Sequence, residues 1–145
     1  MKLPEYKKID VALQMLDTAL EIFFEGKDYF SALHIAGACE EIFAQHLRLK
    51  GVVTSLESDA HAFIQIKKTL TGIESPLKEV KIFLNNSKNS IKHMNDGKDL
   101  FVKMDPKDDA EAMLDRAITN LWRLDVVFSP LVEKFLNDQE AKYIK

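Results

Sequence analysis

The chain has 145 residues, of which 46% are hydrophobic and 30% charged, a composition typical of one globular domain and not of a disordered tail. Its net charge of -3 argues against a protein that coats nucleic acid without regard to sequence. The single cysteine, Cys39, excludes an intramolecular disulfide and a cysteine-based zinc site, and we expect no metal and no cofactor.

The ends and the hydrophobic runs of the chain predict a protein that does not enter a membrane. Residues 1–8 lack the apolar core of a signal peptide, and no apolar stretch approaches the ~20 residues that cross a bilayer. We therefore expect a cytoplasmic protein. Only five Gly and four Pro are present, which favours long helices over a β-sandwich with many turns.

The hydrophobic pattern predicts two helices in the first 50 residues. Apolar residues recur at three- and four-residue spacing between residues 5 and 25, and Gly26 can end this helix. Asp28 is a natural N-cap for a second helix, which runs to Lys50. Because the link between the helices is so short, they should be antiparallel.

Two further helices are predicted before residue 95. A polar stretch, residues 52–58, precedes a third helix from about residue 59 to residue 70. Ser75 and Pro76 form an N-cap and first-turn pair for a fourth helix, which continues to about Met94.

The last third of the chain predicts a loop and one long helix. Residues 96–104 are expected to form a loop packed on the bundle, and whether this loop covers a site as a lid is left open. Asp105 and Pro106 cap a fifth helix that continues to about Asn137, with a kink at Ser129-Pro130 because proline removes a helical donor. One stripe of this helix is apolar: Ala110, Met113, Leu114, Ala117, Ile118, Leu121 and Trp122.

Together these elements predict an all-α, up-and-down bundle of about five helices that forms a single domain over residues 1–145. The second helix is rich in small residues, which indicates close helix packing within the bundle or across a dimer. Charge is distributed unevenly: residues 67–107 carry nine lysines and five acidic residues, so this segment is +4 and the rest of the chain is -7. The basic segment could receive a phosphate, or its lysines could simply keep exposed helices soluble.

The fourth predicted helix carries the most chemically suggestive residues. At about 100° per residue, one of its faces is expected in the core: Leu77, Val80, Leu84, Ser87, Ile91 and Met94. The opposite face carries Asn86, Asn89 and His93, and Lys88 lies about 140° from His93. This polar face is either solvated surface or a site that another surface completes.

The run Lys88-Asn89-Ser90-Ile91-Lys92-His93 resembles the Arg-x(4–6)-His signature of HEPN domains, in which Asn often follows the Arg. Residues 29–41 are similar to the aromatic, small-residue and acid-ended second helix of that family, and the resemblance covers about residues 5–95. It implies a HEPN-like bundle and a homodimer. In the family, the Arg-His pair often forms a metal-independent ribonuclease site across the dimer.

The resemblance implies a role for each residue of the run. His93 would be the acid/base that relays the proton of a ribose 2′-hydroxyl, and Lys88 would hold the phosphate. Asn89 would position the substrate or the histidine, and Asn86 and Lys92 would add to substrate binding.

Two functions stay open. Lys88 stands where the signature has arginine, and lysine lacks the planar fork that grips a phosphate at two oxygens. This favours a dimeric module that binds a nucleotide, RNA or a cognate protein partner. The alternative is an endoribonuclease of the toxin or defence type, with His93 and Lys88 acting across a dimer.

Glu40 is a supporting candidate, because it lies on the apolar stripe of the second helix. An unpaired buried carboxylate is costly, so Glu40 should have a partner. Lys88 or His93 can fill this role if the second and fourth helices face each other. Alternatively, Glu40 lies at the helix edge and reaches water.

Overall fold

The computed structural model describes residues 1–144, and within them the chain forms seven α-helices and no strand. The predicted all-α class is confirmed. Seven helices are present where about five were predicted, because two of the predicted helices are each divided. Over the same residues, no helix has both the length and the apolar character that crossing a bilayer requires.

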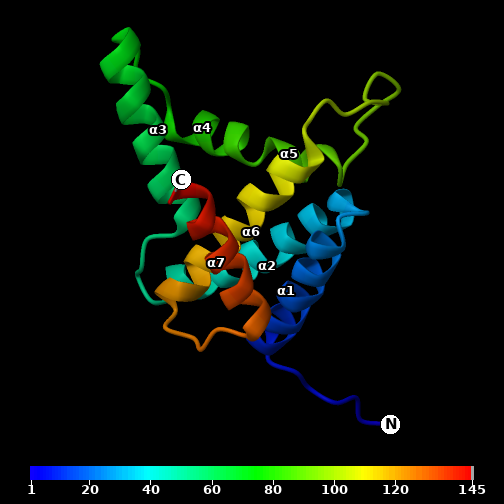
Figure 1. The fold of residues 1–145 in the computed structure, drawn as a ribbon. Helices are drawn as coiled ribbons and strands as arrows, with labels where there is room; N and C mark the ends of the chain where they lie inside the picture. The colour runs from blue at the N-terminus through cyan, green and yellow to red at the C-terminus, as the bar shows by residue number, and fades with distance from the viewer. Residues whose placement is uncertain (145) are drawn as a thin grey trace.

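Four helices form the part of the molecule that we call the body: α1 (Lys8–Glu25), α2 (Tyr29–Leu49), α6 (Pro106–Arg123) and α7 (Pro130–Tyr143) (Figure 1). The predicted link between the first two is confirmed. Gly26 ends α1 in the left-handed conformation at φ 71°, which costs glycine little, and the Asp28 side chain accepts from the backbone N–H of Ser31.

The core lies where α2 packs between α1 and α6. Small residues of α2 let these helices approach closely, among them Ala32, Ala36 and Cys39, which are fully buried. The Cys39 thiol donates to the Ala12 carbonyl at 3.3 Å, and burial raises its pKa to about 12. Cys39 therefore behaves as a small buried hydrophobe.

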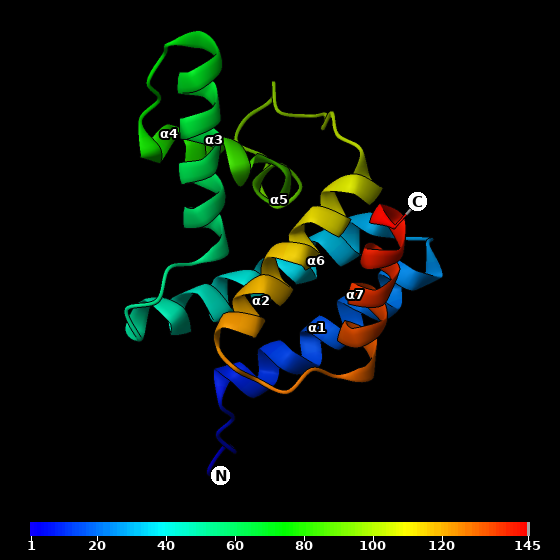
Figure 2. The same cartoon turned by 60° about the vertical axis from the view of Figure 1, so that its left-hand side comes forward.

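The arm, residues 55–84, projects from one end of the body and contains α3 (Ser55–Thr71) and α4 (Leu77–Leu84) (Figures 1 and 2). Helix α3 begins four residues earlier than predicted. Its start is fixed by a capping box, in which Thr54 accepts from the Glu57 N–H and the Glu57 carboxylate accepts from the Thr54 N–H.

The fourth predicted helix is divided at Asn85, and the prediction of one helix to Met94 is wrong. A short helix α5 (Asn86–Ser90) follows α4, and the chain after it is a loop. The faces were assigned at about 100° per residue for one continuous helix, so the assignment does not hold beyond Asn85. Of the six residues expected on its core face, only Val80 is buried, while Leu77 and Met94 are exposed. Within the arm, α4 packs only against α3, so most of its predicted core face stays unburied.

The fifth predicted helix is also divided, into α6 and α7. The connection between them, residues 124–129, contains Asp125 at φ 56°. Ser129-Pro130 starts a new helix and does not kink an existing one: the Ser129 hydroxyl accepts from the Val132 N–H, and Pro130 occupies the first turn. Trp122, expected on the apolar stripe, is 68% exposed, because at about 100° per residue it lies at the edge of that stripe.

Replacement of Leu121 and of Trp122 by alanine tests where the apolar stripe of α6 ends. Leu121→Ala should lower the free energy of unfolding by about 3 kcal/mol, because it leaves a cavity in the core. Trp122→Ala should change it by less than ~1 kcal/mol, because most of the ring is in solvent. Urea unfolding followed by circular dichroism measures both. Equal losses would contradict the division of this helix.

Candidate functional site

The structure separates the six residues that the sequence singled out into two groups. Lys88 and Glu40 are buried. The other four side chains are exposed and make no hydrogen bond or ion pair with any residue in the range 1–144: Asn86, Asn89, Lys92 and His93. The predicted pair of Lys88 and His93 is therefore not assembled within one chain.

Glu40 on α2 is 2% exposed, and two cationic side chains reach its carboxylate. Nζ of Lys88 on α5 lies 3.4 Å from Oε2, and Nη2 of Arg116 on α6 lies 3.2 Å from Oε1. A buried carboxylate is tolerated where cations and hydrogen-bond donors replace water. The predicted pairing of Glu40 with Lys88 is confirmed, and Arg116 is a second partner that was not predicted.

Arg116 extends these contacts to the end of the arm. Its Nη1 donates to the Leu84 carbonyl at 3.0 Å, and its Nη2 donates to Oδ1 of Asn85 at 2.9 Å. The carbonyls in the last turn of a helix lack partners within that helix, so the guanidinium satisfies one of them. The break between α4 and α5 is thereby bound to the body.

Asn120 makes the corresponding contact with the start of the arm. Its Oδ1 accepts from the backbone N–H of Ser55 at 2.8 Å, and its Nδ2 lies 3.4 Å from Oε1 of Glu40. Both ends of the arm are thus bound through residues that also contact Glu40. We call this group the central cluster, and it consists of Glu40, Lys88, Arg116 and Asn120.

Glu41 lies at the rim of the central cluster and adds a second carboxylate, so that two carboxylates face the two cations Lys88 and Arg116. Its Oε1 is 2.7 Å from Nζ of Lys88, and its side chain is about half exposed. Partial burial pulls the pKa of Glu41 upward, but the hydrogen bond and charge of Lys88 outweigh this and lower the pKa below its ordinary value. The Lys88 ammonium therefore contacts two carboxylates, which leaves it poorly placed to hold a phosphate.

Gly37 provides the space that Lys88 occupies. It lies one turn before Glu40 on α2, and a Cβ at this position would be 3.2 Å from Cδ of Lys88. That distance is shorter than ordinary van der Waals contact, so any larger residue would displace the lysine stem. The small residue at position 37 is part of what lets Lys88 reach Glu40.

Sequence reasoning missed Arg116 and Asn120, although the sequence holds a signal for both. They are four residues apart and both are buried, at the edge of the stripe that was expected to be apolar, next to Met113 and Ala117. Polar side chains on a buried helix face require partners from other elements. This pattern, together with Glu40 on the apolar stripe of α2, indicates a buried polar cluster.

The exposed His93 lies in the loop after α5, beside a shallow cavity of about 390 Å³ that apolar side chains also line, among them Phe30, Met94 and Phe101. Nothing in the range 1–144 holds the imidazole in place for proton transfer. Within the same residues, no group of three or more His, Cys, Asp or Glu side chains is placed to bind a metal ion.

A second cavity, of about 410 Å³, lies between the arm and α6 and has three aspartates in its walls. Asp59 comes from α3, and Asp109 and Asp115 come from α6. Asp109 accepts from the Ser87 hydroxyl at 2.6 Å, whereas Asp59 and Asp115 form no ion pair with any residue in 1–144. We call this cavity the acidic cleft; its walls also include Phe83, Met113 and Arg116.

Both unpaired aspartates of the acidic cleft are exposed, and partial loss of water around each carboxyl raises its pKa. For Asp59, this desolvation outweighs the opposing effect of the Arg116 and Arg123 charges. For Asp115, the neighbouring charges of Asp59 and Glu111 add to it. Neither carboxylate has an ion-pair partner among residues 1–144, and a positive group entering the cleft would stabilise both.

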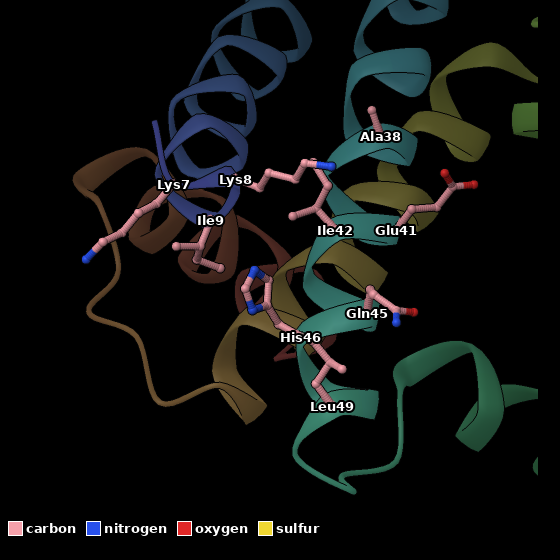
Figure 3. Close-up of a pocket in the computed structure, with 9 residues that line it drawn as sticks. All are labelled: Lys7, Lys8, Ile9, Ala38, Glu41, Ile42, Gln45, His46 and Leu49. Atoms are coloured by element: carbon pink, nitrogen blue, oxygen red, sulfur yellow. The ribbon is translucent and has the colours of Figure 1, made fainter. Parts of the chain in front are cut away.

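A third cavity, of about 730 Å³, is a groove between the start of α1 and the outer side of α2 (Figure 3). Its floor is apolar, with Ile9 and Ile42 from the two helices. Figure 3 shows the His46 ring between the helices and the Lys8 side chain extended toward α2. The groove has the shape to receive an apolar group, but its residues do not specify one.

Comparison with known proteins adds no relative to this description: no protein-family model, no curated protein and no solved structure matches the chain.

Neutralising Glu40 tests the central cluster. Glu40→Gln keeps the shape of the side chain but removes the one carboxylate that pairs with Arg116 among residues 1–144 and leaves Lys88 with Glu41 alone, so it should lower the free energy of unfolding by about 3 kcal/mol. Glu41→Gln is the matched control and should cost less than ~1 kcal/mol, because that carboxylate is half exposed. Urea unfolding at pH 7 measures both, and a smaller loss for Glu40→Gln than for Glu41→Gln would refute the assignment.

Proposed function

We propose that this chain is a protein-interaction module that acts as a homodimer, with the arm and the loop after α5 forming its contact surface. The observation that carries the proposal is the distribution of exposed apolar side chains. Eleven of the 23 large hydrophobic residues that are exposed lie between Phe63 and Val102, a segment of only 40 residues. Such a concentration is typical of an interaction surface.

The arm has a physical reason to need a partner. Helix α3 packs on α4 through one face, and Phe63 lies against Phe83 with ring centroids 5.7 Å apart. The neighbouring side chains Ile66 and Leu70 are exposed. A helical hairpin buries little apolar area by itself, so a second surface would add substantially to its stability.

Three of the four lysines of the arm have partners within the arm. Lys68 pairs with Glu74, Lys81 lies 3.5 Å from Glu57, and Lys67 donates to the Ser75 hydroxyl. A surface that binds phosphates needs cations free to contact them. Of the arm's lysines, Lys78 alone has no ion pair or side-chain hydrogen bond with residues 1–144, and a single free ammonium group favours a protein partner over RNA or a nucleotide.

The position of Lys88 weighs against the endoribonuclease alternative. That mechanism needs a cation at the scissile phosphate beside an acid/base histidine. Lys88 is buried and contacts Glu40 and Glu41, whereas His93 is exposed in a loop. The HEPN resemblance supports the homodimer but adds no contact between these two side chains.

Two residues with nearly the same exposure give a matched test. The wild-type chain should have twice the mass of one chain by light scattering after size exclusion. Phe101→Ser should shift it toward the monomer, because Phe101 is 90% exposed on the proposed surface. Val127→Ser should have no effect, because Val127 is 91% exposed but lies in the connection between α6 and α7.

A wild-type chain that is monomeric at 100 μM, a concentration on the order of that at which weak dimers form, would overturn the proposal. So would an equal effect of the two substitutions. Cleavage of RNA by the purified wild type, lost in His93→Ala, would instead support the endoribonuclease.

A further inference from the structure

The acidic cleft has features that the proposed function does not yet use. Asp59 and Asp115 face it from the arm and the body without an ion-pair partner among residues 1–144, and Phe83 provides an aromatic wall. Arg116 lines the same cleft, is 8% exposed, and has a buried Nε that finds no acceptor among residues 1–144. A ligand with a cation for the aspartates, an apolar group for Phe83 and a hydrogen-bond acceptor would therefore complement the cleft.

The loop after α5 carries these three kinds of group on one short segment. We call residues 98–104 the basic loop; its sequence is Lys-Asp-Leu-Phe-Val-Lys-Met. Phe101 is more exposed than its apolar neighbours Leu100 and Val102. Lys98 and Lys103 form no ion pair within the described part of the chain. Asp99 is turned back on the loop, where it accepts from Asn95. The loop thus presents an aromatic ring between two lysines, with backbone carbonyls that accept hydrogen bonds.

We propose that the basic loop of one copy docks in the acidic cleft of a second copy. This inference rests on the proposed homodimer and names its contacts: Lys98 and Lys103 with Asp59 and Asp115, and Phe101 against Phe83. The positive loop meets the negative cleft, and an apolar ring meets an apolar wall. Complementary charge of this kind sets the register of an interface and excludes wrong partners.

The arrangement allows two reciprocal contacts. The arm and the basic loop project from the same end of the molecule (Figures 1 and 2). In a two-fold dimer, each copy gives its loop and receives the loop of the other, so the contact closes on itself and does not extend into a filament. The second copy is therefore the occupant that this surface fits.

Charge reversal on each side, followed by mixing, tests the contact. One variant carries Lys98→Glu and Lys103→Glu; the other carries Asp59→Lys and Asp115→Lys. When either variant pairs with itself, like charges meet in both contacts, so the dissociation constant of that dimer should rise on the order of 100-fold. Mixing the two restores opposite charges in both contacts, and the dimer should reform. Lys27→Glu with Lys50→Glu is the control for charge change outside the loop.

The outcomes separate this inference from the proposed function. A dimeric wild type whose reversed variants also remain dimeric would overturn the loop-in-cleft contact and leave the homodimer intact. Two monomeric variants that stay monomeric when mixed would overturn the contact as well. A monomeric wild type would overturn the homodimer itself. If Asp59→Lys with Asp115→Lys does not fold by circular dichroism, Asp59→Asn with Asp115→Asn replaces it, and weaker dimerisation is then the expected result.

Discussion

A single buried carboxylate, Glu40, joins elements that are far apart in the sequence. It lies on α2 in the middle of the body, and the cations that neutralise it come from α5 and α6. Because neither cation can leave without exposing a buried charge, the position of α5 relative to the body is strongly constrained. The arm is constrained as well, because Arg116 binds its last residue, Leu84, and Asn120 binds its first, Ser55.

The central cluster also determines what the surface presents. Arg116 on α6 binds the end of α4, and apolar side chains of the arm are exposed, among them Ile66, Leu70 and Phe83. The space left between arm and body is the acidic cleft, whose aspartates come from both sides. Lys88, which the HEPN resemblance assigned to a phosphate, contributes to this geometry through its contacts with Glu40 and Glu41. In this account, the same buried charges that fix the arm create the surface proposed to bind a second copy.

The sequence predicted much of the fold, because its strongest signals are local. The end of α1 and the start of α2 follow from Gly26 and Asp28. The cost of a buried charge predicted that Glu40 has a partner and left Lys88 and His93 as candidates, of which Lys88 is the one found. The division at Asn85 could not be predicted in this way, because it depends on contacts with Arg116, a residue 31 positions away. The division at Ser129 is a similar case. Ser129 caps α7 and also donates a hydrogen bond to Asp17 on α1, and only the tertiary structure shows the second contact. His93 is exposed, as its place on the face away from the core allowed, but the helix that was expected to carry it ends at Ser90.

The claim that the central cluster fixes the arm is tested most directly by measuring the distance between arm and body. Spin labels at Lys78→Cys on α4 and Glu21→Cys on α1, in a Cys39→Ala background and diluted with excess unlabelled chain so that only distances within one chain are seen, report this distance by pulsed electron paramagnetic resonance. If the central cluster fixes the arm, the distances form one narrow distribution that broadens when Glu40→Gln is added and stays narrow with Glu41→Gln. An equally narrow distribution in the Glu40→Gln protein would show that the arm is held by other contacts and would contradict the account.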